Sequence, residues 1–322
     1  MTMPVSTFDP PREYAHTTVM AEQAVRALDP RLGGVYLDVT VGGGGHSAAI
    51  LEACRGSRVV AFDRDRVAVG AARERLAPYA DRVRVLHAEF GSLEERLREL
   101  NLDAVDGLIA DLGVSSQQLE DAARGMSFRA EGPLDMRMDR STGDTALELV
   151  ERLSQEDLAK VIFQFGQERR SRRVARCIKQ SLARRELETT RDLRRAVVRA
   201  VGPHRIGGID PATRTFQALR IAVNEEISQL AMLLESLPRI VKPGATVVFI
   251  SFHSLEDRAV KCAFRDASLW ERLSKKPLVP TRDEIDGNPR ARSAKLRAAR
   301  RVADPNANPP QSSPGEPGGA HE

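Results

Sequence analysis

Four consecutive glycines follow a short apolar run that ends in an acid. Residues 35–50 read VYLDVTVGGGGHSAAI, and a helical pattern follows the glycines. Glycine adopts positive φ easily and lets a ligand approach the backbone without a Cβ in the way. The amides at the start of a helix can then face a polar ligand. Read as G-x-G-x-x-A from Gly43 to Ala48, the loop would also suit a dinucleotide. The segment predicts a nucleotide-binding loop after a strand.

Three further apolar runs end in residues that could bind a ligand. Residues 58–62 lead to Asp63, about twenty residues beyond the loop, where an acid in this topology holds ribose hydroxyls. Residues 83–87 lead to Phe90, and residues 105–110 lead to Asp111. A lone Asp at such a place is more often a turn residue or a helix N-cap. Four strand ends with polar or aromatic residues together favour a site.

The elements that would position these residues alternate along the chain. Helix-length segments such as 66–76 and 92–100 separate the apolar runs. Such alternation predicts an α/β fold with a parallel sheet and with ligands at the carboxyl ends of its strands. After Asp111 the alternation stops. Residues 125–139 have the composition of a loop, and residues 145–201 have helical spacing, so an all-helical block is expected to interrupt the sheet.

The chain is expected to return to the sheet after this block. Apolar residues from 215 to 240 recur near every 3.5 positions and predict one long amphipathic helix. Gln217, Arg220 and Asn224 share another face of that helix, either as ordinary surface polarity or as part of a site. A turn at 242–244 should precede a fifth strand, 246–251, which ends in the motif SFHSLEDR.

Composition narrows the class of protein. The chain has 322 residues and 41% hydrophobic content, enough for a core. No run reaches transmembrane length and no signal-peptide pattern begins the chain, so we expect a soluble, cytoplasmic protein that does not bind membranes. Its three cysteines and six histidines show no ligand spacing, and we therefore expect neither a disulfide framework nor a metal.

Positive charge is concentrated in one segment. Residues 169–205 hold thirteen Lys and Arg against three acids, a local net charge of +10, although the whole chain carries only +4. A phosphate backbone is a natural partner for that field. The alternative is a solvated, arginine-rich helical face.

The predicted pocket could hold either a nicotinamide dinucleotide or S-adenosylmethionine. A dehydrogenase usually needs a proton-transfer residue such as a Tyr–Lys pair beside its substrate, and no such pairing stands out. A methyltransferase mainly needs a nucleophile positioned in line with the methyl group. This difference favours S-adenosylmethionine.

Seven ordered motifs resemble the bacterial RsmH family, also called MraW. They are HTTVMAEQ (16–23), DVTVGGGGHS (38–47), DLGVSSQQLE (111–120), GPLDMRMD (132–139), PATRTFQALRIAVNEE (211–226), SFHSLEDR (251–258) and NPRARSAKLR (288–297). The resemblance implies an enzyme that transfers a methyl group from S-adenosylmethionine to the N4 amine of a cytidine in the decoding centre of 16S ribosomal RNA. It also implies a class I, Rossmann-like methyltransferase sheet with an inserted all-helical domain.

The resemblance assigns the cofactor to particular residues. The loop and its histidine would face the methionine part, Asp63 the ribose and Phe90 the adenine. The full set is Gly44, Gly45, His46, Asp63, Phe90, Asp111 and Gln118. Asp111 could instead cap a strand end, and His46 could merely start a helix.

The target cytidine is expected to swing out of the RNA into a pocket between the two domains. Its catalytic lining would be Asp111, Ser115, Asn224 and His253, and RNA would be bound by Arg169, Arg172, Arg173 and Arg220. Either Asp111 or backbone carbonyls of residues 112–115 could accept the amine protons.

The predicted boundaries follow from these elements. Residues 1–124 and 212–302 would form the methyltransferase domain, 125–211 the inserted helical substrate-binding domain, and 303–322 a disordered tail. The partner would be 16S rRNA, expected within the small ribosomal subunit, with naked RNA and a homodimer left open. A protein that holds RNA without turnover is the alternative function, and a dehydrogenase is a less favoured one.

Overall fold

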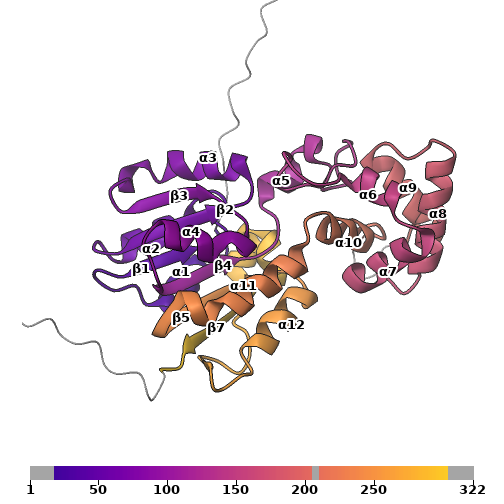
Figure 1. The fold of residues 1–322 in the computed structure, drawn as a ribbon. Helices are drawn as coiled ribbons and strands as arrows, with labels where there is room; N and C mark the ends of the chain where they lie inside the picture. The colour runs from indigo at the N-terminus through magenta and orange to yellow at the C-terminus, as the bar shows by residue number, and fades with distance from the viewer. Residues whose placement is uncertain (1–17, 205–209, 304–322) are drawn as a thin grey trace, which may run out of the picture.

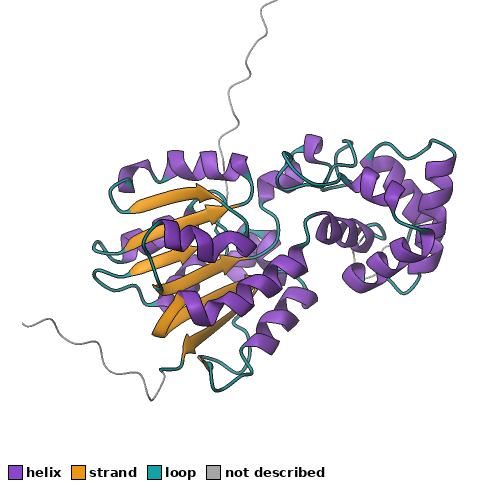
Figure 2. Cartoon of the chain, viewed as in Figure 1, coloured by secondary structure: helices purple, strands orange, loops and turns teal. Residues whose placement is uncertain are grey.

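One seven-stranded sheet forms the centre of the larger lobe in the computed structural model, which describes residues 18–204 and 210–303 (Figures 1 and 2). The strand order is β3-β2-β1-β4-β5-β7-β6, with β1 to β5 parallel and β7 antiparallel to both of its neighbours. The strands are β1 (Val35–Asp38), β2 (Arg58–Asp63), β3 (Val83–His87), β4 (Val105–Asp111), β5 (Val241–Ser251), β6 (Trp270–Arg272) and β7 (Lys295–Arg301).

Helices cover both faces of the sheet because its central strands are apolar on both sides. Along β4, Leu108 and Ala110 enter one core while Ile109 enters the other, as the period of two in a strand requires. One face is covered by α1 (Ala21–Leu28), α2 (Gly45–Ala53) and α3 (Arg66–Arg75). The other face is covered by α4 (Leu93–Glu99), α11 (Glu226–Ile240) and α12 (Ser254–Ala263).

A second lobe of helices lies beside the sheet (Figure 1). It has its own core, which includes Leu158, Ile178 and Val197 and is closed by Phe216. Its helices are α6 (Ala146–Arg152), α7 (Gln155–Gly166), α8 (Ser171–Ala183), α9 (Thr190–Val201) and α10 (Thr213–Val223). The lobe is inserted between β4 and β5.

Shorter elements complete the described chain. They are α5 (Ser116–Glu120), α13 (Arg282–Gly287) and the 3-10 helices η1 (Ala77–Tyr79), η2 (Phe90–Ser92), η3 (Ala122–Arg124) and η4 (Pro289–Ser293). None of the described helices is both long and apolar enough to cross a bilayer.

The α/β class with a Rossmann-like sheet and a helical insertion is confirmed, and the first four strands lie where the sequence predicts them. The fifth begins earlier, at Val241, because residues 242–244 form an irregular start to the strand rather than a separate turn. Its register against β4 shifts between Val105 and Gly107. The antiparallel β6 and β7 were not predicted, since β7 carries the sequence KLRAARR with four cationic side chains.

The prediction of a single helix over residues 215–240 is wrong. The chain breaks into α10 and α11 at Asn224 and Glu225, and Glu225 adopts the left-handed region at φ 50°. The hydrophobic spacing continues across the break, which is why periodicity alone does not reveal it. The break places Arg220 at the end of one helix and Glu226 at the start of the next.

Other expectations fall outside what the structure tests. Residues 304–322 of the predicted tail and the first two residues of the motif at 16–23 lie outside the described residues. The exact domain boundaries at 124, 211 and 302 stay predictions.

Candidate active site

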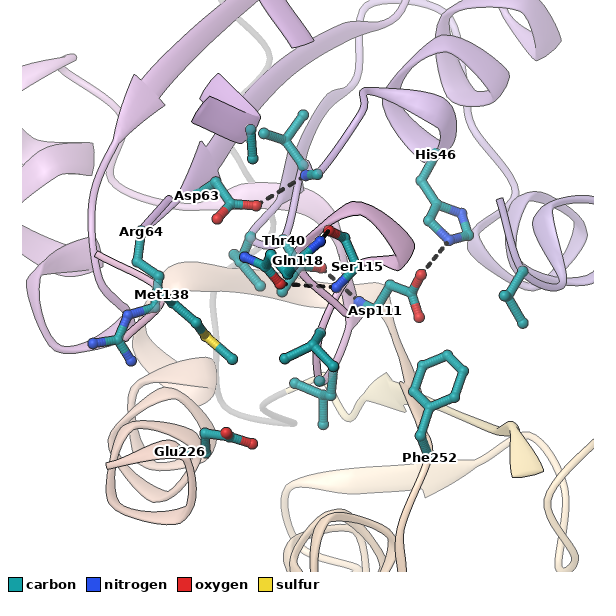
Figure 3. A pocket seen from close by; sticks show the side chains of 18 of the residues that line it. Thr40, His46, Asp63, Arg64, Asp111, Ser115, Gln118, Met138, Glu226 and Phe252 are labelled. Carbon is teal, nitrogen blue, oxygen red and sulfur yellow. Dashed lines mark hydrogen bonds and ion pairs between the residues drawn. The ribbon is translucent and has the colours of Figure 1, made fainter. Parts of the chain in front are cut away.

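A pocket opens at the carboxyl ends of β1, β2 and β4, between the sheet and the loops that follow it (Figure 3). In the order β3-β2-β1-β4-β5 the connections diverge to opposite sides between β1 and β4, and ligands of open α/β sheets bind at such a switch point. Of the predicted residues, those that line this pocket are Gly45, His46, Asp63, Phe90, Asp111, Ser115 and Gln118.

The glycine loop forms one wall. Gly42 and Gly44 have φ of 49° and 79°, in the left-handed region that favours glycine. A Cβ on Gly45 would meet the Thr18 hydroxyl oxygen at 1.7 Å, so this first residue of α2 must also be glycine. Gly44 turns away toward Leu76 and is not among the lining residues. Its place in the predicted cofactor set is therefore behind the loop rather than in the wall.

Asp63 stands at the end of β2 and faces the pocket. Its carboxylate accepts the backbone amides of Gly42 and Asp65, each at 2.9 Å. Burial raises the pKa of Asp63 to about 6, although the two amide donors act in the opposite direction. Asp63 thus holds the glycine loop in place. Its carboxylate would also be stabilised by a hydrogen-bond donor from a ligand in the pocket.

His46 and Asp111 form a buried pair, with 3.5 Å between Nε2 and Oδ2. Burial lowers the pKa of His46, but the neighbouring Asp111 and the more distant Asp38 outweigh it and raise the pKa overall. Both ring nitrogens of His46 and Oδ1 of Asp111 lack a hydrogen-bond partner among the described residues. Buried polar atoms normally have partners, so this end of the pocket suits a polar ligand.

Thr40, two residues after Asp38, has a structural role that its side-chain hydroxyl explains. The Asp111 amide donates to the Thr40 hydroxyl at 2.6 Å, which joins the ends of β1 and β4. Asp38 itself is buried, accepts the Ser47 hydroxyl at 2.7 Å and does not line the pocket. Its role is to hold the start of α2 against β1.

A polar network builds the wall at α5. Ser115 caps this helix, and its amide donates to the Gln118 side-chain oxygen at 2.9 Å. The Gln118 side-chain nitrogen donates to Asp65 at 2.8 Å, and Asp65 forms a buried ion pair with Arg124, also at 2.8 Å. Gln118 lines the pocket, but both ends of its amide are engaged within the protein.

The opposite wall contains residues that sequence reasoning missed. Met138, Glu226, Phe252, Glu256 and Arg290 all line the pocket, and Figure 3 shows Glu226 on α11 and Phe252 beyond β5 on the side away from Asp63. The signal for these residues lies in the motifs: GPLDMRMD contains Met138, PATRTFQALRIAVNEE ends in Glu226, SFHSLEDR contains Phe252 and Glu256, and NPRARSAKLR contains Arg290.

His253 lies at the edge of the site and is not a lining residue. It caps α12, where Nδ1 accepts the Glu256 amide at 3.4 Å and Nε2 lies 3.0 Å from a Glu256 carboxylate oxygen. Glu226, His253 and Glu256 each place one potential metal-ligand atom within 4.8 Å of the others. The spacing of histidines and cysteines along the chain, on which the expectation of no metal depends, does not reveal this group.

The structure turns Arg220 and Asn224 inward. Arg220 forms a bidentate ion pair with Glu226 at 2.7 and 2.9 Å. The Asn224 side chain accepts the Met138 amide and donates to the Met136 carbonyl, both at 2.7 Å. Neither lines the pocket. Arg220 is thus not placed to hold an RNA phosphate directly, and Asn224 supports the loop that carries Met138.

Arg169, Arg172 and Arg173 are exposed at the start of α8. The ion pairs of neighbouring helix α9 within the described residues involve other arginines, Arg194 with Asp210 and Arg195 with Asp192. The adjacent Gln167 accepts the Ser254 hydroxyl at 3.2 Å, which joins the end of α7 to the start of α12. This contact places the residue just before the arginine cluster beside the start of α12, two residues after Phe252 of the pocket wall.

Comparison with known proteins identifies the family. The MraW methylase family matches residues 13–302. A protein of Sorangium cellulosum named ribosomal RNA small subunit methyltransferase H is 62% identical over 292 residues, which cover 91% of this chain and 92% of that protein. A protein of the same name from a Cyanothece strain is 50% identical over 290 residues, covering 90% of this chain and 96% of that protein. The chain belongs to the MraW methylase family.

Proposed function

We propose that this protein transfers a methyl group from S-adenosylmethionine to the N4 amine of a cytidine in the decoding centre of 16S ribosomal RNA. Membership of the MraW methylase family and the names of its relatives support the reaction class and the substrate. The observation that carries the proposal is the pocket itself, in which a glycine loop, Asp63 and the unsatisfied His46–Asp111 pair meet at the switch point of the sheet.

The donor groups of the pocket fit S-adenosylmethionine. Asp63 would hold the ribose hydroxyls, Phe90 would cover the adenine, and the amides of the loop with His46 would hold the methionine part. Acidic side chains suit its positive charge, because a cation is stabilised by nearby carboxylates. When bound, this cofactor supplies a methyl group whose carbon–sulfur bond breaks with the electron pair going to sulfur.

The chain must do two things for the cytosine amine. It must bring the amine nitrogen into line with the methyl carbon, to which the nitrogen bonds. It must also accept N–H bonds, because the lone pair of this nitrogen is delocalised into the ring, and one amine proton must leave as the new bond forms. Asp111 and residues 112–115 line this part of the pocket, and the Asp111 carboxylate and the backbone carbonyls of these residues are candidate acceptors.

A reconstituted reaction tests the proposal. Purified protein, methyl-labelled cofactor and small subunits from cells that lack the gene should yield one N4-methylated cytidine per 16S molecule. We propose the subunit as the preferred substrate, so naked 16S RNA should react more slowly. Cofactor binding without transfer to either RNA would instead support a protein that only holds RNA.

A homodimer also remains a proposal. Light scattering at assay concentrations would distinguish it from a monomer.

A further inference from the structure

Glu226 is an acid that faces the pocket from the wall opposite Asp63. It is the first residue of α11, and its side chain is only 9% exposed. Figure 3 shows its carboxylate projecting from the helix toward the hollow between Met138 and Phe252. None of the cofactor positions described above includes it.

Arg220 holds this carboxylate in one orientation. The guanidinium Nε donates to Oε1 at 2.7 Å and Nη2 donates to Oε2 at 2.9 Å, with the Arg220 side chain 12% exposed. Each carboxylate oxygen can accept about two hydrogen bonds. One acceptor position on each oxygen is therefore left after the fork-like pairing, and the pocket is where it can be used.

The carboxylate also lies close to the end of β4. Its oxygen is within 4.8 Å of a Glu256 oxygen and a His253 nitrogen. Glu256 accepts the Phe252 amide at 2.9 Å. A Cβ built on Gly113 would stand 3.6 Å from the Phe252 ring and 3.9 Å from Glu256. Glu226 thus belongs to the same corner as Phe252 and the turn that follows Asp111.

A metal ion is the other ligand that these side chains could hold, but the local charge disfavours it. The Arg220 guanidinium already neutralises Glu226. Glu256 already accepts two backbone amides, and His253 Nε2 lies 3.0 Å from its other carboxylate oxygen. A divalent cation would have to displace these donors and lie beside a guanidinium, and like charges at such separations repel strongly. A neutral N–H donor can use the remaining acceptor positions without that cost.

We propose that Glu226 recognises the target base by accepting an N–H bond from the exocyclic amine of cytosine, with the ring lying against Phe252. This inference rests on the proposed function, and it identifies Glu226 as the group that selects cytidine for methyl transfer. Carboxylates recognise the amine of cytosine in nucleic-acid complexes, and flipped bases are commonly held against aromatic side chains. Uracil presents a carbonyl at the same position, so two acceptors would face each other and uracil would be rejected.

The test compares cytidine with uridine at the target position of otherwise identical 16S transcripts. Binding is measured in the presence of S-adenosylhomocysteine, so the readout does not depend on methyl transfer. Wild-type protein should prefer the cytidine transcript. Glu226→Gln should reduce that preference about tenfold, because its amide can donate to uracil. Glu225→Gln, at the exposed neighbouring residue outside this pocket, should keep the full preference.

A second variant separates recognition from folding. Glu226→Asp keeps the charge and should keep the preference for cytidine, while the shorter side chain lowers kcat. Cofactor affinity and Tm serve as folding controls for each variant. An unchanged preference in folded Glu226→Gln would overturn the proposal. So would a wild-type preference that disappears with chelator and returns with Mn²⁺.

The proposed function could fail separately. In that case the wild-type protein would give no N4-methylcytidine, whatever its preference in the binding assay.

Discussion

At the scale of single residues, one carboxylate at the end of β2 serves both the loop and the pocket. Asp63 accepts two backbone amides and still has acceptor capacity toward the cavity. Burial raises its pKa to about 6, so cofactor binding should depend on pH if Asp63 holds the ribose as proposed. Hydroxyl donors favour the charged carboxylate, so binding should favour deprotonated Asp63.

We expect Asp63→Ala to weaken the binding of S-adenosylmethionine by roughly 1.5 to 3 kcal/mol, the contribution of charge-assisted hydrogen bonds. In the wild-type protein, affinity should fall as the pH drops through about 6, because protonation removes the preferred form. By pH 5 only about a tenth of the carboxyls would be charged, which corresponds to a roughly tenfold loss of affinity. Titration calorimetry between pH 7.5 and 5 measures both effects.

Asp63→Asn provides the control for pH. It cannot titrate, but it retains His46, whose raised pKa should affect both proteins alike. The pH profile of Asp63→Asn should therefore be flatter than that of the wild-type protein. Identical profiles would rule out Asp63 as the group that binds the ribose.

Asp111 should matter for the chemical step more than for binding. Asp111→Asn keeps the shape of the side chain but accepts N–H bonds less well, so turnover should fall about a hundredfold while RNA affinity changes little. Single-turnover kinetics and RNA binding at the same salt concentration separate the two quantities. If both decrease in proportion, Asp111 contributes only to binding.

These residues could be predicted because parallel strands place their carboxyl ends at one edge of a sheet. Asp63 and Asp111 are the last residues of strands, and Phe90 follows one, that apolar composition already revealed. Glu226 and Phe252 could not be found in this way. Their position depends on how α11 and β5 return to the sheet after more than a hundred residues of insertion, which local patterns do not encode.

At the scale of elements, a buried ion pair ties the wall of the pocket to the segment that enters the helical lobe. Arg124 of η3 forms an ion pair with Asp65, the residue that also caps α3. The Arg124 guanidinium also donates to the Met138 carbonyl at 3.1 Å. Asn224, where α10 ends, binds the amide of the same Met138. The loop of residues 132–139 is thus held from both sides of the insertion.

Arg124→Ala should lower the free energy of unfolding by about 3 to 5 kcal/mol, because it leaves the buried Asp65 without its guanidinium. Urea denaturation measures the change. Arg129→Ala, at an exposed arginine a few residues away, should change stability by less than about 0.5 kcal/mol. The double variant Asp65→Leu/Arg124→Leu should recover part of the loss. Equal effects of Arg124→Ala and Arg129→Ala would contradict the assigned role of the ion pair.

The elements themselves were predictable to different degrees. Helix starts such as Ser154, followed by the acidic Glu156 and Asp157, can be recognised from sequence, and in the structure the Ser154 side chain accepts the amide of Asp157. The interruption at Asn224 was not visible, because the hydrophobic spacing continues across it and the contacts of Asn224 are with Met136 and Met138, which are distant in the sequence. The antiparallel β7 was hidden by its charges, which the structure accommodates because Arg297 pairs with Asp257 and Arg300 with Glu271, while the apolar residues of the strand are buried.

At the scale of the whole molecule, the proposed function requires the pocket of the larger lobe to receive the target base, and we propose that the exposed arginines of the smaller lobe hold the same RNA. Charge reversal at Arg169, Arg172 and Arg173 should weaken RNA binding and leave cofactor affinity unchanged. If these side chains contact phosphates, the slope of log affinity against log salt should flatten by about 2, as expected for three lost contacts to single-stranded RNA. Fluorescence anisotropy over a salt series measures the slope.

The control reverses Arg31, Arg55 and Arg58, which are exposed near the amino ends of β1 and β2, away from the pocket. That variant should retain the wild-type slope. If the two triple variants behave alike, the arginine cluster is a solvated face and the RNA docks elsewhere.

The central claim is that this chain places a methyl group on N4 of a cytidine in the decoding centre of 16S rRNA. Mass spectrometry of small-subunit RNA from cells with the gene, without it, and complemented with Asp111→Asn tests this directly. The account predicts N4 methylation at one decoding-centre cytidine in the first strain, its absence in the second and a strong reduction in the third. An unchanged methylation pattern in the cells without the gene would contradict it.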